Sequence, residues 1–169
     1  KGRMRERSFA HSKSLQEQAA ELISHYPDGE SRSASLMVLH AIQDEAGYIS
    51  AEAMQWAASE IGIKPLNLYE LVTFYPMLRE EPPGKFVLKV CRTLSCAMAG
   101  GKELHENLCD KLKLNPNTHG LQTTEDGKFS IEFAECLASC GTGPVMMCND
   151  NFHEAVNETK ADKILEKCD

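Results

Sequence analysis

Seven cysteines are the residues of this 169-residue chain whose type and spacing could do chemistry. Four of them form two close pairs, Cys91-x4-Cys96 and Cys136-x3-Cys140, with 39 residues between the pairs. Four thiolates suit either a zinc ion or an iron–sulfur cluster. Four-cysteine zinc sites mostly use the tighter C-x2-C spacing, and a C-x4-C half also occurs in plant-type 2Fe–2S ferredoxins. The spacing therefore favours a 2Fe–2S cluster, with zinc, and disulfides or plain thiols, as the other interpretations.

Small residues follow both pairs. After the first pair come Ala97, Ala99, Gly100 and Gly101, and after the second come Gly141, Gly143 and Pro144. Such residues allow backbone amides to approach the sulfurs, and amides at a helix N-terminus favour negative charge. We expect these amides to surround a negatively charged site and to tune its potential.

The composition bounds the class of protein. Apolar residues make up 42% and charged residues 25%, which is typical of a globular domain. The net charge is −7, although residues 1–13 are basic, so the body is acidic and unsuited to nucleic acid. No apolar run is long enough to span a bilayer, and residues 1–13 lack the apolar segment of a secretory signal. With an odd number of cysteines, we expect a reducing, cytoplasmic setting, a flexible segment over 1–13, and no direct membrane insertion.

Two halves with different periodicity must position the cysteines. Residues 14–80 contain no cysteine and show helical spacing in four stretches, 14–26, 33–46, 51–61 and 65–72. Gly47 and Gly62 fit the ends of the second and third helices, and Ser50 fits an N-cap. Short loops between these stretches predict a small antiparallel helical bundle over residues 14–80.

Residues 81–169 form the second predicted domain. Strands are expected at 85–90, 129–134 and 145–148, with a hairpin partner at 152–156, and helices at 97–114 and 160–168. The order β-α-β-β-β-α predicts an α/β (α+β) domain. Each cysteine pair begins where a strand has just ended, and such strand ends form the ligand site of open α/β sheets. The pairs therefore meet if strands 85–90 and 129–134 are neighbours.

Other catalytic motifs are absent from the sequence. It has neither the GxGxxG of a dinucleotide site nor a Walker-type lysine loop. Since a 2Fe–2S centre exchanges one electron at a time, a chain that carries only such a centre acts as a relay or store. We expect a partner to carry the two-electron chemistry.

Two motifs and the helical half together resemble a known family. VCRTLSCAMAGG (90–101) and ECLASCGTGPVMMCND (135–150) are similar to the motifs of the thioredoxin-like 2Fe–2S ferredoxin family. RSASLMVLHAIQDEAGYIS (32–50) and LVTFYPML (71–78) resemble its two-domain branch. That branch includes the NuoE-type subunit of NADH:quinone oxidoreductase (complex I) and the equivalent subunits of NAD-linked hydrogenases and formate dehydrogenases.

The resemblance implies a fold, a ligand set and a partner. It implies a thioredoxin-like domain over 81–169, with Cys91, Cys96, Cys136 and Cys140 holding one 2Fe–2S cluster. FMN and NADH are then expected on a larger iron–sulfur flavoprotein subunit, together with other peripheral-arm or hydrogenase subunits, and not on this chain. The cluster is expected to take single electrons from that flavin, as part of an oxidoreductase, and the isolated chain is not expected to oxidise NADH. A structural zinc module remains the second alternative.

The remaining cysteines and one loop residue carry separate expectations. Cys109 lies on the apolar stripe of the helix and is expected in the core. Cys148 is expected to be a small buried hydrophobe, and Cys168, near the terminus, to be exposed. Ala138 stands where many members of the family have glycine, and we expect a loop that tolerates alanine there.

Overall fold

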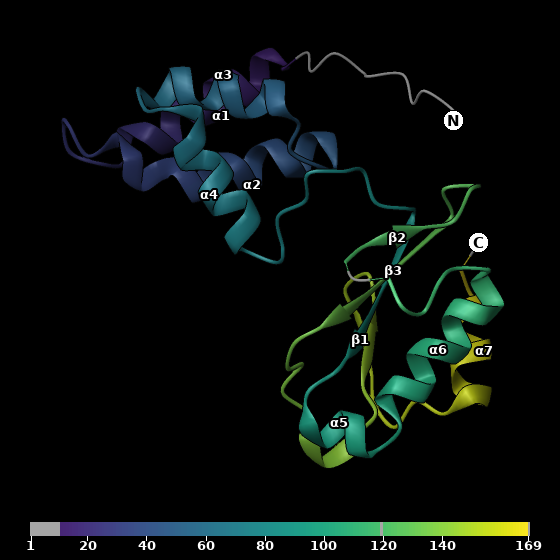
Figure 1. Cartoon of the computed structure of the whole chain (residues 1–169). Coiled ribbons are helices and arrows are strands. Elements are labelled where there is room, and N and C mark those ends of the chain that lie inside the picture. Colours follow the sequence, from purple (N-terminus) through teal and green to yellow (C-terminus); the bar gives the residue numbers. More distant parts are fainter. Residues whose placement is uncertain (1–10, 119, 169) are drawn as a thin grey trace. The chain divides into compact units, whose positions relative to one another are not determined.

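The computed structural model describes residues 11–118 and 120–168, which divide into two compact units that meet between Pro82 and Pro83 (Figure 1). Of the expected flexible segment 1–13, residues 1–10 lie outside the described residues. Ser12 caps the first helix, since its hydroxyl accepts a hydrogen bond from the backbone N–H of Leu15. In the described residues, no helix is long and apolar enough to cross a membrane.

The first unit is helical, as the spacing predicted. Its elements are α1 (Lys13–Ser24), the 3-10 turn η1 (Ser31–Ala34), α2 (Ser35–Ala46), α3 (Ala51–Ile61) and α4 (Pro65–Phe74). Gly47 and Gly62 end α2 and α3 in the left-handed conformation, and the Ser50 hydroxyl accepts from the N–H of Ala53 at 3.1 Å. Apolar side chains from the four helices form one core, which includes Leu15, Leu39, Ile42, Ala57 and Leu68.

The second unit contains a five-stranded sheet. Its elements are β1 (Phe86–Cys91), α5 (Leu94–Met98), α6 (Gly101–Leu112), β2 (Gln122–Thr123), β3 (Phe129–Ala134), the 3-10 turn η2 (Cys140–Thr142), β4 (Met146–Cys148), β5 (Asn151–His153) and α7 (Glu158–Glu166). The strand order is β2-β3-β1-β4-β5. β1 and β3 run parallel, and the other neighbouring pairs are antiparallel. The predicted α/β class is confirmed.

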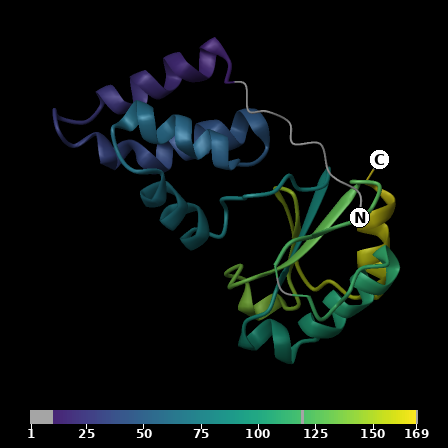
Figure 2. The same cartoon turned by 45° about the horizontal axis from the view of Figure 1, so that its top comes forward.

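Two helices cover one side of this sheet. Figures 1 and 2 show α6 and α7 side by side on the same side, and the two helices contact each other. Their apolar stripes pack on the inward faces of the central strands, where Leu88, Val90, Leu108, Ile131 and Met146 are fully buried. This packing makes β1 the central strand of a rigid core, and the segment that contains Cys91 and Cys96 continues directly from it.

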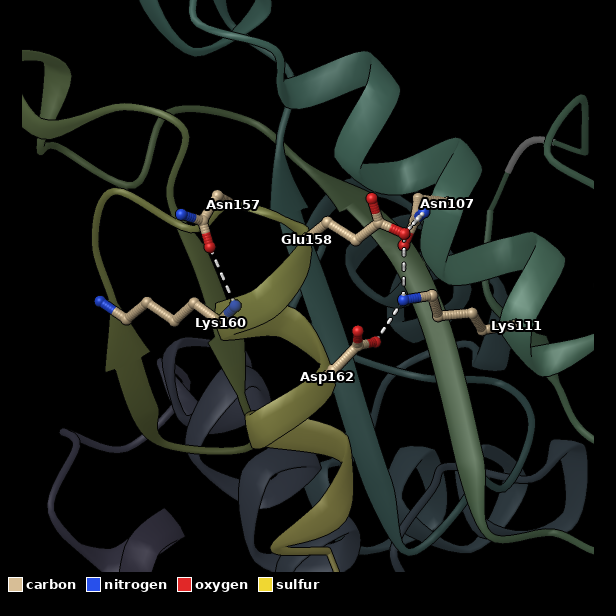
Figure 3. Close-up of polar contacts among 6 residues, drawn as sticks. All are labelled: Asn107, Lys111, Asn157, Glu158, Lys160 and Asp162. Carbon is tan, nitrogen blue, oxygen red and sulfur yellow. Dashed lines mark hydrogen bonds and ion pairs between the residues drawn. The ribbon is translucent and has the colours of Figure 1, made fainter.

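Polar contacts fix the start of α7 against α6 (Figure 3). The side-chain N–H of Asn107 donates to Glu158 at 3.0 Å, and Lys111 forms ion pairs with Glu158 and Asp162. Asn157 caps α7 by accepting from the N–H of Lys160 at 2.9 Å. The first turn of α7 is therefore anchored, and the direction of the helix determines where its last residues lie.

The structure corrects two expectations in this unit. The single helix predicted over 97–114 is two helices, because Gly100 adopts a φ of 97° and breaks the chain between α5 and α6. Cys168 is only 4% exposed, not exposed as expected, because α7 folds its last turn back onto the sheet. Cys109 and Cys148 are buried, as expected.

Candidate metal centre

The two cysteine pairs start at the same edge of the sheet, because β1 and β3 are parallel neighbours. Cys91 is the last residue of β1 and lies opposite Ala134, the last residue of β3. Cys136 follows two residues later in the chain. The neighbour relation on which the sequence argument depended is confirmed. Cys96 lies in α5 and Cys140 begins η2, and these two short helices contact each other at that end of the sheet (Figure 1).

The first pair is enclosed by closely packed backbone. Cys91 and Cys96 are each 1% exposed. A Cβ added at Gly101 would lie 2.8 Å from the carbonyl oxygen of Cys96 and 2.9 Å from that of Cys91. Real Cβ atoms do not approach backbone so closely, so only glycine lets the chain turn from α5 into α6 against these two residues.

Hydrogen bonds bias Cys91 toward the thiolate. Burial by itself raises the pKa of the Cys91 thiol, but hydrogen bonds from the Thr93 hydroxyl and from the backbone of Leu137 and Thr93 lower it overall. The Thr93 Oγ1 lies 3.3 Å from the sulfur. Leu137 belongs to the second cysteine segment, so its bond to Cys91 joins the two segments directly. Hydrogen bonds to a thiolate favour the charged form that binds metal.

Cys96 experiences the opposite shift. Burial raises the pKa of the Cys96 thiol, and a hydrogen bond to Cys91, together with the charges of Cys91 and Cys140, adds to this increase. The backbone of Val145 acts in the other direction by hydrogen bonding to the sulfur. Thiolates from both segments therefore repel one another here, and a bound cation relieves that repulsion.

The second pair lies on an open loop. Cys136 and Cys140 are both exposed. The N–H of Ala138 donates to the Cys136 sulfur at 3.3 Å, and Ala138 has a φ of 59° to make this bond. The expectation that this loop tolerates alanine is wrong in physical terms, because an L side chain in the left-handed region costs about 1–2 kcal/mol.

Polar side chains hold the second segment in place. The hydroxyls of Ser139 and Thr142 both donate to the Glu154 carboxylate, the latter at 2.6 Å. These hydrogen bonds, from Ser139 first and then Thr142, lower the pKa of Glu154. Next to the first residue of each pair, Arg92 forms an ion pair with Glu135, which connects the ends of β1 and β3.

The donors present fit a 2Fe–2S cluster by their chemistry. The site offers four thiols, and backbone hydrogen bonds reach the sulfurs of Cys91, Cys96 and Cys136. Gly143 also leaves the Cys96 sulfur accessible, since a Cβ there would lie 3.5 Å from that sulfur and 3.1 Å from the Cβ of Ala99. Within residues 11–118 and 120–168, no three His, Cys, Asp or Glu side chains are arranged to hold a single metal ion.

Comparison with known proteins identifies the family. The model of the thioredoxin-like [2Fe-2S] ferredoxin family matches residues 19–169. This chain belongs to that family. A NuoE-type subunit of the NADH-quinone oxidoreductase of Rickettsia typhi is 32% identical over 161 residues, covering 95% of this chain and 92% of that protein. Subunit 2 of the NADH-quinone oxidoreductase of Thermus thermophilus is 35% identical over 146 residues, covering 86% and 78%.

Solved structures have the same fold. A crystal structure of a NAD+-reducing [NiFe]-hydrogenase in the H2-reduced state matches with a TM-score of 0.64 at 19% identity. The match covers 79% of this chain and 22% of the hydrogenase chain, so this chain corresponds to about a quarter of that longer one. The resemblance seen in the sequence is confirmed, as is the thioredoxin-like fold, and the family supports an iron–sulfur cluster as the cofactor of this chain.

Several residues around the cysteines were not found from the sequence. Leu137 and Val145 act through their backbone, so their side-chain types give no signal. Glu154 is 15 residues from Ser139 in the chain, and only the fold brings the two together. Thr93 was the one detectable residue, because a hydroxyl two positions after a cysteine can reach its sulfur.

Proposed function

We propose that Cys91, Cys96, Cys136 and Cys140 hold one 2Fe–2S cluster. The observation that carries the assignment is the backbone hydrogen bond from Leu137, in the second cysteine segment, to Cys91, in the first. The influence of Cys140 on Cys96 supports the same pairing of segments. The other three cysteines, Cys109, Cys148 and Cys168, are buried in the core beneath α6 and α7.

The function that this site supports best is that of an electron-transfer subunit. When bound, the cluster exchanges one electron at a time. The chain has no recognisable dinucleotide motif, so hydride chemistry belongs to a partner. We therefore assign to the partner, a larger iron–sulfur flavoprotein, the FMN that receives hydride from NADH and passes single electrons to this chain. The isolated chain has no NADH-oxidising activity of its own.

The lengths of the relatives favour NADH:quinone oxidoreductase (complex I) as the assembly. The NuoE-type proteins of two Rickettsia species are matched over 89% and 92% of their length, so they are separate subunits of the size of this chain. The hydrogenase chain contains this fold within a sequence about four times longer. In complex I, the chain would be a peripheral subunit on the cytoplasmic side. A NAD-linked hydrogenase or formate dehydrogenase is the alternative, and a structural zinc module is the second.

The surface around α5 is suited to a protein partner. Leu94 and Met98, two residues on either side of Cys96, are 76% and 80% exposed. Cys136 and Cys140 are exposed at the same end of the sheet. Large apolar side chains that stay exposed on a globular unit are typical of protein interfaces. A flavoprotein docked on α5 would approach the cysteines on their open side.

Spectroscopy of single-cysteine variants tests the cluster. Wild-type protein purified without oxygen is expected to contain two irons and two acid-labile sulfides per chain, with an EPR signal after dithionite. Each of C91S, C96S, C136S and C140S should lose the cluster or change its spectrum, and C109S, which replaces another buried thiol, should keep it. Equal cluster loss in C109S contradicts the ligand assignment, and one zinc per chain without iron favours the zinc module.

A reconstitution experiment tests the electron-transfer role. NADH alone should leave the cluster of the purified chain oxidised. NADH with the partner flavoprotein from the same genome should reduce it, as shown by the EPR signal. An L94S/M98S variant should slow this reduction while its dithionite-reduced spectrum stays that of the wild type. Reduction by NADH without any flavoprotein would overturn the proposal.

A further inference from the structure

A second pair of thiols lies in the core of the second unit, outside the four-cysteine site. The sulfurs of Cys148 in β4 and Cys168 after α7 are 3.7 Å apart. Both residues are buried, at 5% and 4% exposure, and both are free thiols. Neither is assigned to the cluster, and core packing alone does not require two thiols in contact.

The fold places the two sulfurs together from elements far apart in the chain. Cys148 ends the short strand β4, which pairs with the central strand β1. The first turn of α7 is fixed to α6, as Figure 3 shows, so the last turn brings Cys168 over β4. Cys168 follows the C-cap residue Lys167, and its sulfur donates to the carbonyl oxygen of Ile164 at 3.2 Å.

A cavity of about 510 Å³ gives access to this pair. Both cysteines line it, together with the apolar side chains of Phe86 and Ile164. The cavity also has a basic rim, to which His153 and three lysines contribute, namely Lys160, Lys163 and Lys167. The lysines follow α7 at a spacing of three and four residues, which places them on one helix face. A small molecule that carries negative charge is therefore favoured in this cavity.

We propose that Cys148 and Cys168 form a second redox site, a dithiol that is oxidised to a disulfide by an anionic low-molecular-weight disulfide bound in this cavity. The site is independent of the cluster and does not depend on the proposed electron-transfer function. Oxidation needs the sulfurs to approach from 3.7 Å to the bond length of about 2.05 Å. Cys168 provides that movement, because only the last turn of α7 and no strand pairing holds its backbone.

The exchange takes place in two balanced steps. The Cys168 sulfur, as thiolate, attacks one sulfur of the small disulfide, and one small thiolate leaves and takes up the proton that Cys168 lost. The Cys148 sulfur, after losing its own proton, then attacks the Cys168 sulfur, and the second small thiol leaves. Two protein thiols are oxidised to one disulfide, and one small disulfide is reduced to two thiols.

The environment of Cys148 assigns the order of these steps. Burial raises the pKa of the Cys148 thiol to about 12, and the neighbouring Cys168 adds to the increase. Cys148 therefore rests as a thiol and is a poor first nucleophile. Attack by Cys168 comes first, and Cys148 acts as the resolving thiol.

Peptide mapping of the cluster-loaded chain tests the site. The full chain is equilibrated without oxygen in buffers of increasing glutathione disulfide to glutathione ratio, free thiols are alkylated, and the digest is analysed by mass spectrometry. We expect a disulfide-linked pair of peptides containing Cys148 and Cys168 while the cluster absorbance is unchanged. C148S and C168S should abolish this species and C109S should keep it. If both residues stay alkylatable in the most oxidising buffer, or if the linked peptides join other cysteines, the proposal is wrong.

A second experiment tests the ligand class and does not depend on cysteine variants that fail to fold. Rates of disulfide formation in the wild type are compared for glutathione disulfide, which is anionic, hydroxyethyl disulfide, which is neutral, and cystamine, which is cationic. The anionic reagent should react several-fold faster than the other two, and the advantage should shrink in K163Q/K167Q but not in the control K102Q. Equal or faster reaction with cystamine overturns the assignment of an anionic reagent.

Discussion

The two cysteine segments of the site are held by different forces. The segment from Cys91 to Gly101 is enclosed by backbone packed to contact distance, and both of its cysteines are buried. The segment from Cys136 to Gly143 is exposed, and polar contacts to Glu154 hold it instead. The contrast teaches that one side of the site is a fixed wall and the other an open loop facing a partner. Substitutions should therefore act on fold stability in the first segment and on cluster retention in the second.

The largest effect should come from adding one methyl group to the packed segment. G101A places a Cβ within 3 Å of the carbonyl oxygens of Cys91 and Cys96. Because both neighbours are backbone, they have to move, and overpacking of this kind costs about 1–3 kcal/mol. Urea unfolding should show a lower free energy of unfolding, and the purified protein should contain less iron.

The matched control for G101A is the same change in the open segment. An added Cβ at Gly141 meets nothing within 4 Å. G141A should therefore leave the free energy of unfolding within about 0.5 kcal/mol of the wild type. Equal losses in G101A and G141A would contradict the distinction between a packed and an open segment.

A smaller effect, of the opposite sign, is expected at Ala138. Its φ of 59° is unfavourable for alanine and suits glycine. A138G should raise stability by about 1 kcal/mol and slow the loss of the cluster in air, since the N–H that reaches Cys136 is held with less strain. A99G is the control, because Ala99 has a φ of −90° and gains nothing from glycine. If A138G destabilises the protein as much as A99G does, the strain assigned to the loop is absent.

Glu154 tests whether polar contacts retain the open segment. E154Q replaces the charged acceptor of the Ser139 and Thr142 hydroxyls by a neutral one, which weakens both hydrogen bonds. The bleaching rate of the cluster in air should increase, while the urea midpoint should hardly change. E125Q removes a carboxylate from an exposed turn and serves as the control. A faster bleaching in both variants would attribute the effect to net charge rather than to the loop.

The same contrast explains which parts of the molecule could be predicted. Strand β3 has the predicted bounds, and Gly47 and Gly62 end their helices as expected, because alternation and capping are local signals. The two cysteine pairs were also placed correctly at one edge of the sheet, since parallel strands fix their ends together. These features need only neighbouring residues and one topological rule.

Features that depend on distant contacts were missed. The break at Gly100 was hidden because the leucines of α6 continue the apolar spacing, and the tight approach of Gly101 to Cys96 is visible only in the fold. β2 has two residues, too few for alternation to be detected. The burial of Cys168 depends on the direction that α6 imposes on α7, which no local pattern contains.

The smallest expected effect concerns His105, the buried histidine behind the second segment. His105 is 1% exposed on α6 and stacks on Phe133 of β3, with ring centroids 3.8 Å apart. Burial lowers its pKa from the ordinary value of 6.5, and the nearby charge of Glu106 opposes this only in part. The unfolded chain therefore binds a proton more readily than the folded chain. As the pH falls below about 6.5, protonation favours unfolding, so the free energy of unfolding decreases.

The variant H105F isolates this contribution, because phenylalanine keeps the stacking on Phe133 but cannot be protonated. Urea unfolding at intervals from pH 7.5 to 5.5 should show a slope below pH 6.5 in the wild type that is shallower in H105F. His25 is exposed and serves as the control, so H25F should keep the wild-type slope. His153, whose pKa burial also lowers, contributes equally to all three proteins and cancels in the comparison. An unchanged slope in H105F would mean that the contact between α6 and β3 accepts a charged imidazole, and that the wall behind the open segment is less closed than its packing indicates.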